Sequence, residues 1–146
     1  MARVLIAEDD LMIADLLEET LVGHGYEVCG IARTVAKAIA LGHLHSPDFA
    51  ILDLRLAEGG LGTTIAVELA ASRRTGILYT TGNIAQLDFG TAEGDACLAK
   101  PFRSSDLLRS LEIVAEIVAT GTTSPPYPLG LTFLHPVGPA ALEIHR

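Results

Sequence analysis

Residues 3–10 read RVLIAEDD, an apolar run that ends abruptly in three acidic residues. An uninterrupted apolar run of this length is typical of a parallel strand that is buried on both faces. Residues 11–22 then show a helical spacing of apolar residues, whose expected core face holds Ile13, Leu16, Leu17 and Leu21. The glycines of residues 23–25 end that helix because glycine readily adopts positive φ angles. The chain therefore begins with a buried strand whose carboxyl end carries acids, followed by an amphipathic helix.

The same pattern of a strand followed by a helix repeats as far as residue 119. The predicted strands span residues 3–7, 26–32, 49–52, 77–80 and 96–99, and the predicted helices span residues 11–22, 35–44, 64–73 and 105–118. Thr34 and Ser105 are the expected N-caps of the second and the last of these helices. The alternation predicts an α/β fold, with a five-stranded parallel sheet and helices on both faces.

Residues 83–94 are the least regular part of this pattern. They include two glycines and few strong helix formers, although Ile84, Leu87 and Phe89 follow a helical spacing. We expect a short or frayed helix there.

The composition changes at Thr120. Residues 120–146 hold five of the seven prolines of the chain, and proline excludes both a helix interior and a central strand. We expect a globular domain over residues 1–119 and a proline-rich C-terminal extension over residues 120–146, either extended or packed on the domain. The candidates for docking on an apolar groove are Leu129, Leu131, Phe133 and Leu134.

Composition and charge narrow the class of protein. The chain has 146 residues, 49% of them hydrophobic, and a mean hydropathy of +0.40, which suits one domain with a substantial core. Its net charge of −8 repels phosphates and anionic lipid, so we expect neither direct nucleic-acid binding nor a membrane-bound protein. The first apolar run is too short for a signal peptide, and Cys29 and Cys97 form no disulfide framework. These features favour a cytoplasmic protein.

Charged and hydroxyl residues follow four of the predicted strands. Glu8 and Asp9 follow the first strand, Asp53 the third, Thr81 the fourth and Lys100 the fifth. The carboxyl ends of parallel strands lie at one edge of a sheet, so we expect these side chains to converge.

A convergence of this kind has a chemical consequence. Three carboxylates in one pocket repel each other strongly unless a cation lies among them, and Mg²⁺ suits oxygen ligands. A lysine and a hydroxyl beside the metal complete a site for a phosphoryl group. Within such a site Asp53 is the candidate nucleophile, which would accept the phosphoryl group as an acyl phosphate.

The chain resembles the receiver domain of two-component response regulators. The likeness rests on four segments in the family's order, residues 4–10 (VLIAEDD), 51–54 (ILDL), 79–82 (YTTG) and 100–102 (KPF), each at the end of a predicted strand. It covers residues 3 to about 119 and implies the flavodoxin-like fold of receivers. The YTTG run is similar to the variant receivers that carry an aromatic-Ala-Thr-Gly motif at this place.

The resemblance implies a role for the polar residues of the pocket. Asp53 stands at the phosphoacceptor position, Thr81 at the position of the switch hydroxyl and Lys100 at that of the phosphate-binding lysine. The bond between Lys100 and Pro101 matches a peptide bond that is usually cis in the family. Such a protein is a signalling phosphoacceptor rather than an enzyme, because it catalyses only its own phosphorylation and dephosphorylation.

The resemblance also implies a Mg²⁺ site. Asp9 stands at the position of a direct ligand, and Glu8 at that of an acid that holds a metal-bound water. Asp53 and the backbone carbonyl of Arg55 complete the metal ligands, and Asp10 is a secondary acid.

The partners implied by the resemblance are proteins. A sensor histidine kinase or a histidine phosphotransfer protein donates the phosphoryl group, and a downstream protein target reads the result. No DNA-reading output domain is expected in residues 120–146, and a homodimer stays open as an alternative.

The sequence departs from the family at Cys97. The family usually has an aromatic residue there, three positions before Lys100. A small thiol cannot replace a ring that swings between two positions, so the usual coupling of hydroxyl and ring is not expected. We interpret Cys97 as a small core residue.

Two other hypotheses compete with a stand-alone receiver. A pseudo-receiver scaffold or adaptor, which phosphorylation does not switch, is suggested by Cys97, the irregular residues 83–94 and the apolar extension. A phosphatase of the Asp-x-Asp type shares the nucleophile, but it needs a second acid two residues after Asp53, where this chain has Arg55. We therefore favour the receiver.

Overall fold

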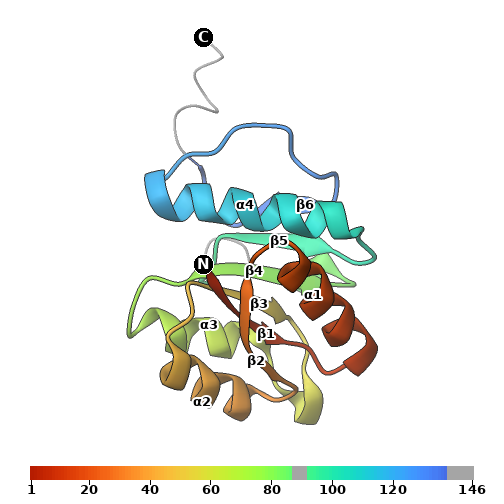
Figure 1. Ribbon diagram of the computed structural model, residues 1–146, viewed down its shortest axis with the longest axis vertical. Helices are drawn as coiled ribbons and strands as arrows, with labels where there is room; N and C mark the ends of the chain where they lie inside the picture. Colours follow the sequence, from red (N-terminus) through yellow and green to blue (C-terminus); the bar gives the residue numbers. More distant parts are fainter. Residues whose placement is uncertain (87–91, 138–146) are drawn as a thin grey trace.

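The computed structural model describes residues 1–86 and 92–137, which form a six-stranded sheet covered by helices (Figure 1). In chain order the elements are β1 (Arg3–Ala7), α1 (Leu11–Gly23), β2 (Glu27–Ala32), α2 (Val35–His45), β3 (Phe49–Asp53), η1 (Ala57–Gly59), α3 (Gly62–Ala70), β4 (Gly76–Thr81), η2 (Ile84–Gln86), β5 (Ala96–Ala99), α4 (Ser104–Thr120) and β6 (Leu131–Phe133). The strand order is β2-β1-β3-β4-β5-β6, with β1 to β5 parallel and β6 antiparallel to β5. The chain order reverses between β1 and β3, where parallel sheets place their ligand sites.

The predicted α/β fold with five parallel strands is confirmed, and the sheet gains a sixth strand that was not predicted from the sequence. β6 lies in the proline-rich extension between Pro128 and Pro136, so neither ring interrupts its three residues. Ala96 of β5 pairs with Phe133 of β6. The outer edge of β5 would otherwise present unpaired backbone groups, which gives the extension a place to bond.

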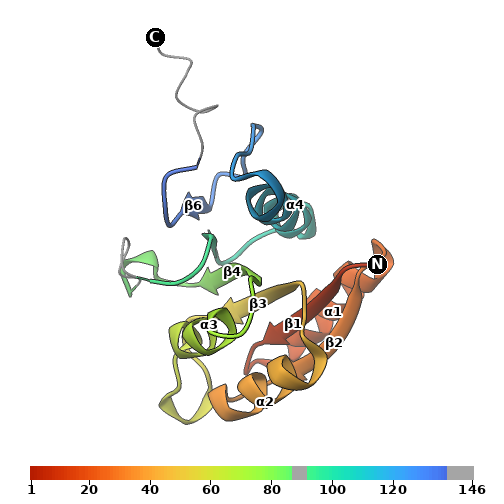
Figure 2. The ribbon, with the colours of Figure 1, turned by 90° about the vertical axis from the view of Figure 1, so that its left-hand side faces the viewer.

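Helices cover both faces of the sheet, with α2 and α3 on one face and α1 and α4 on the other (Figures 1 and 2). Neighbouring residues of β1 point to opposite cores. Leu5 packs in the cluster beneath α2 and α3, whereas Val4 and Ile6 pack in the cluster that includes Leu107 and Leu111 of α4. β1 is therefore buried on both faces, as its uninterrupted apolar sequence predicts. Within residues 1–86 and 92–137, no helix is both long and apolar enough to cross a membrane.

Side chains fix the starts of the first two helices. Thr34 Oγ1 accepts a hydrogen bond from the Lys37 N–H at 3.2 Å, which confirms the predicted N-cap of α2. Asp10 Oδ1 accepts the Met12 N–H at 3.0 Å, so this acid caps α1.

The prediction that Ser105 caps the last helix is wrong. α4 starts at Ser104, with Arg103 at the N-cap, and Asp106 Oδ2 accepts the Arg103 N–H at 3.4 Å. The carboxylate of Asp106 reaches back to the Arg103 N–H, and an acid in the first turn both satisfies a free backbone N–H and favours the helix dipole, so the helix starts before Ser105.

The irregular stretch after β4 contains a single helical turn in its described part. η2 spans three residues from Ile84, which agrees with the short helix predicted there. Leu87 and Phe89, on which the rest of that prediction depends, belong to residues 87–91 and lie outside the described residues.

Gly62 brings the start of α3 against the end of β3. Its N–H donates to Leu54 O at 3.0 Å, and a Cβ at this position would lie 2.3 Å from the backbone oxygen of Asp53. A backbone oxygen cannot move aside as a flexible side chain can, so only glycine fits this contact. The close approach helps to hold the strand end that carries Asp53.

We predict that Gly62→Ala destabilises the protein by about 2 kcal/mol, because the new methyl group must push α3 away from β3. Urea unfolding followed by circular dichroism measures the change. The matched control is Gly23→Ala at the end of α1, where nothing lies within 4 Å of an added Cβ and no loss of stability is expected. Equal stability of the two variants would contradict the role given to Gly62.

Candidate functional site

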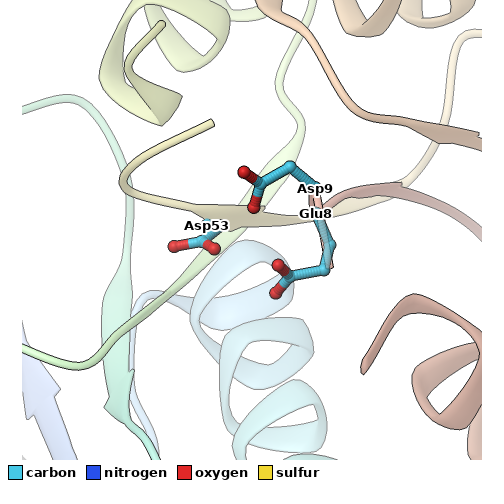
Figure 3. Close-up of side chains that lie close together, drawn as sticks. All are labelled: Glu8, Asp9 and Asp53. Carbon is cyan, nitrogen blue, oxygen red and sulfur yellow. The ribbon is translucent and has the colours of Figure 1, made fainter. Parts of the chain in front are cut away.

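The carboxyl ends of β1 and β3 bring three acids together. Glu8 and Asp9 follow β1, and Asp53 is the last residue of β3. One carboxylate oxygen from each lies within 4.8 Å of the other two, and Figure 3 shows the three side chains gathered at these strand ends. The expected convergence of the acids is therefore present, and it concentrates negative charge in one small pocket.

Lys100, directly after β5, brings a positive charge into this pocket. Its Nζ donates to Glu8 Oε1 and to Asp53 Oδ2, each at 3.0 Å. The peptide bond between Lys100 and Pro101 is cis, as the resemblance implied. The two charge-assisted hydrogen bonds of one ammonium group thus tie the ends of β1, β3 and β5 together.

Burial shapes the electrostatics of the pocket. Glu8 is 1% exposed and Asp53 9%. Burial raises the pKa of Glu8, and hydrogen bonds from the Asp10 N–H and from Lys100 offset this only in part. Burial by itself would lower the pKa of Lys100, but the hydrogen bonds to Glu8 and Asp53 outweigh it and raise that pKa. The lysine therefore stays protonated, whereas the charge on Glu8 has an energetic cost.

Thr81, the last residue of β4, lies beside Lys100 along the backbone. The Lys100 N–H donates to Thr81 O at 2.8 Å, and the preceding Thr80 pairs with Asp53 in the sheet. The Thr81 hydroxyl accepts the Asn83 N–H at 3.0 Å and donates to Asn83 O at 3.2 Å. In this arrangement the hydroxyl is bonded to the loop after β4, one strand away from Asp53.

Arg55 lies in the loop that follows β3. Its N–H donates to Asp53 Oδ1 at 3.3 Å, and its backbone forms an isolated antiparallel bridge with Leu61. The residue is exposed. The backbone of Arg55 is thus fixed next to Asp53, while its side chain reaches solvent.

Cys97 lies in the core, as predicted. It is fully buried on β5 in register with Tyr79 of β4, and burial raises the pKa of its thiol to about 12. The side chain therefore stays a neutral thiol and packs as a small residue. The aromatic ring at this level of the sheet belongs to Tyr79, which is fully buried and donates its hydroxyl to the carbonyl of Glu93.

An apolar groove, which was not predicted from the sequence, lies beside the acidic pocket. Its volume is about 400 Å³, and it is lined by Ile13 and Leu16 of α1 and by residues 100–102. Leu16 is 59% exposed, although its helical spacing assigned it to the core face of α1. The available signal was the number of apolar residues in α1, which exceeds what one buried helix face can hold.

Comparison with known proteins agrees with this geometry. The family model of the response regulator receiver domain matches residues 4–112. The chain belongs to this family. Receiver domains are signalling modules and generally not enzymes.

Named relatives of this receiver are regulators. The transcriptional regulatory protein PdtaR of Mycobacterium tuberculosis is 37% identical over 115 residues, which cover 76% of this chain and 55% of PdtaR. The chain spans about half the length of the curated relatives that it matches.

Solved structures of receiver domains are similar to this chain in fold. A CheY-like receiver domain protein from Methanospirillum hungatei has a TM-score of 0.70 and 27% identity, and the match covers 80% of this chain and 95% of that one. The anti-anti-sigma factor PhyR of Bartonella quintana has a TM-score of 0.68 and 25% identity, with 81% and 48% covered. These similarities confirm the predicted flavodoxin-like receiver fold.

We predict that Glu8→Gln stabilises the metal-free protein at pH 7 by about 1 kcal/mol, because it removes a desolvated charge and keeps an oxygen for Lys100. The folded-state pKa of Glu8 lies above its ordinary value of 4.5, so its charge opposes folding above the raised pKa. That cost falls as the pH drops toward 4.5. The gain from the substitution should therefore shrink between pH 7 and pH 4.5, which urea unfolding at each pH measures.

Glu19→Gln is the control for Glu8→Gln, since it makes the same change of charge at an exposed position of α1. A gain of equal size in the control would show that relief of the general negative charge, rather than burial of Glu8, causes the effect. A gain that does not change with pH would contradict the raised pKa.

Proposed function

We propose that this chain is a receiver module that accepts a phosphoryl group on Asp53 and signals by protein–protein contacts in the cytoplasm. The observation that carries the proposal is the double hydrogen bond of the Lys100 ammonium to Glu8 and Asp53, with Asp9 in the same cluster. A carboxylate between a lysine and further acids has the surroundings that phosphoryl transfer needs once a cation balances the charge.

The acidic cluster fits Mg²⁺ by the chemistry of its donors. Glu8, Asp9 and Asp53 each offer a carboxylate oxygen, and the backbone of Arg55 is fixed beside Asp53. Magnesium prefers oxygen ligands and is commonly held by one or two carboxylates and several waters. We assign these three acids and the Arg55 carbonyl as the groups that would hold the ion, Glu8 through a water. When bound, it would neutralise charge on the phosphoryl oxygens.

Asp53 is the nucleophile in this proposal. One of its carboxylate oxygens forms a P–O bond as the P–N bond of a phosphohistidine breaks, and the imidazole leaves with the electron pair and takes up a proton. The product is an acyl phosphate, which water later hydrolyses. Lys100 keeps its proton throughout, and its charge offsets the negative charge added beside Asp53.

Thr81 is the group that would respond to the new charge. We infer that its hydroxyl exchanges the hydrogen bonds to Asn83 for a hydrogen bond to a phosphoryl oxygen. Because Cys97 replaces the usual aromatic residue, no ring follows this movement from β5. The response must then pass through the backbone of β4, which ends at Thr81, and of β5, which Lys100 directly follows.

The groove beside Lys100 is the proposed docking site of the phosphoryl donor. Lys100 lines the groove and is bonded to Asp53, so an apolar helix seated against Leu16 and Phe102 would lie next to the acidic pocket. The neighbouring Met12 is 82% exposed and extends the apolar surface. A sensor histidine kinase or a histidine phosphotransfer protein is the donor that this family implies.

The proposed output is the binding of a downstream protein. One relative is named a transcriptional regulatory protein and another an anti-anti-sigma factor, which are both regulatory roles. The net charge of −8 disfavours direct contact of this chain with DNA. An adaptor that binds a target protein in its phosphorylated form reconciles these two observations.

We predict that acetyl phosphate with Mg²⁺ adds one phosphoryl group to the chain, detected by intact mass. Asp53→Asn removes the nucleophile and should lower the yield at least about tenfold, as should omission of Mg²⁺. Asp15→Asn, an exposed acid of α1, is the matched control and should be modified as the unchanged chain is. An unmodified wild-type chain that also binds no Mg²⁺ would overturn the proposal and favour a scaffold that phosphorylation does not switch.

We predict that Leu16→Ser slows phosphoryl transfer from a histidine kinase or phosphotransfer protein by about tenfold, because it removes apolar docking surface. Phosphorylation by acetyl phosphate should be unchanged, since a small donor needs no docking surface. Leu44→Ser on α2, 73% exposed and on the other face of the sheet, is the control. The donor comes from a phosphotransfer screen, and equal slowing with both kinds of donor would contradict docking at the groove.

A further inference from the structure

Residues 121–134, here called the strap, run back along α4 and then along β5 (Figures 1 and 2). Its last part contains β6, and two hydrogen bonds extend the pairing beyond that short strand. Ala99 N–H donates to Gly130 O at 3.0 Å, and Leu134 N–H donates to Asp95 O at 3.1 Å. The strap therefore covers the outer edge of β5 along its whole length.

Side chains of the strap reach both cores. Leu134 is 4% exposed and packs in the cluster that holds Tyr79 and Cys97, whereas Leu131 and Phe133 pack against the opposite cluster. The apolar side chains thus straddle the edge of the sheet. An edge that would otherwise invite pairing with another chain is closed from within the molecule.

Polar anchors hold the first half of the strap to α4. Arg109 Nη2 donates to Ser124 O at 2.7 Å and its Nε to Pro126 O at 3.0 Å. The hydroxyl of Thr123 donates to the carboxylate of Glu116. These anchors bind the helix and not β5, so the second half of the strap can separate from the sheet while the first half stays in place.

The second half of the strap is held to β5 by a three-residue edge strand and by the buried side chain of Leu134. β6 has three residues, each of them only partly buried, and the side chain of Leu129 beside it is fully exposed. A short strand at a sheet edge opens at a smaller free energy than the whole domain unfolds. This segment is therefore suited to move without loss of the fold.

β5 connects this movable segment to the acidic pocket. The N–H of Ala99 is hydrogen-bonded to Gly130 of the strap, and Ala99 directly precedes Lys100. The Nζ of Lys100 is hydrogen-bonded to Asp53. The backbone N–H of Lys100 is bonded to Thr81 of β4. Two consecutive residues thus join the strap on one side of β5 to the proposed phosphoacceptor on the other.

We propose that the strap is the output element of this receiver, and that phosphorylation of Asp53 releases residues 128–134 from β5. The inference rests on the phosphoacceptor role proposed above. β3 and β6 lie on opposite sides of β5 in the sheet, so a movement of Lys100 toward a phosphoryl group on Asp53 lengthens the Ala99–Gly130 hydrogen bond. The freed edge of β5 then pairs with an extended segment of the downstream protein.

Hydrogen exchange of the full chain, followed by mass spectrometry, tests this release. The chain is compared in Mg²⁺ alone and in Mg²⁺ with beryllofluoride, an analogue of the phosphoryl group. We expect the amides of Ala99 and Leu134 to exchange roughly tenfold faster in the loaded state, whereas Leu111 in the core of α4 keeps its protection. Asp53→Asn is expected to abolish the difference.

Binding of beryllofluoride gives a second measurement. If occupancy of the pocket weakens the strap, then weakening the strap must in turn tighten the binding of beryllofluoride in the pocket. Phe133→Ala removes an edge-on contact with Tyr127, in which the ring centroids lie 5.2 Å apart. It is expected to tighten beryllofluoride binding by about threefold or more. Leu129→Ala, in the same segment but with an exposed side chain, is the matched control and should bind as the unchanged chain does.

The outcomes separate the two proposals. An acyl phosphate on Asp53 combined with unchanged or slower strap exchange, or with unchanged binding in Phe133→Ala, overturns the release of the strap and leaves the phosphoacceptor role intact. Absence of any phosphoryl adduct overturns both. Circular dichroism verifies that Phe133→Ala is folded, and Phe133→Leu, which keeps most of the apolar area but loses the ring contact, replaces it if it is not.

Discussion

The charge balance between one ammonium group and a cluster of carboxylates is the constraint on which the site depends. Lys100 lies 3.0 Å from oxygens of both Glu8 and Asp53, and Asp9 lies in the same cluster. Without that ammonium, two nearly buried carboxylates would face each other with no positive partner. Because the three acids still outnumber the lysine, the pocket favours a further cation, and a new anionic group at Asp53 would redistribute every bond that Lys100 makes.

The backbone holds this pocket as firmly as its side chains do. Gly62 allows α3 to touch the backbone of Asp53, and the N–H of Lys100 binds Thr81. Cys97 has no ring, and the ring of Tyr79 is fully buried. Beyond the side chain of Thr81, a rearrangement at the strand ends would therefore pass through the backbone, in particular that of β5, which ends next to Lys100.

Two surfaces flank the pocket and suit different partners. The groove lined by Leu16 and Phe102 is apolar, open and adjacent to Lys100, which suits the proposed phosphoryl donor. The strap, residues 121–134, covers the edge of β5 and so prevents the pairing with other chains that an open edge allows. A receiver with an open entry side and a covered output side would keep the phosphoryl donor and the target apart.

Local sequence pattern was sufficient to predict the parallel sheet, most of its helices and the convergence of the acids. Uninterrupted apolar runs such as residues 3–7 require burial on both faces, and the ends of parallel strands share one edge, so these features follow from local pattern and general geometry. Three features became clear only from the folded chain: Leu16 is exposed, Arg103 rather than Ser105 is the N-cap of α4, and residues 131–133 form a strand. Each of these features depends on which helix face, backbone N–H or sheet edge the rest of the chain leaves uncovered. A local sequence pattern does not show which residues far along the chain pack or bond at that place.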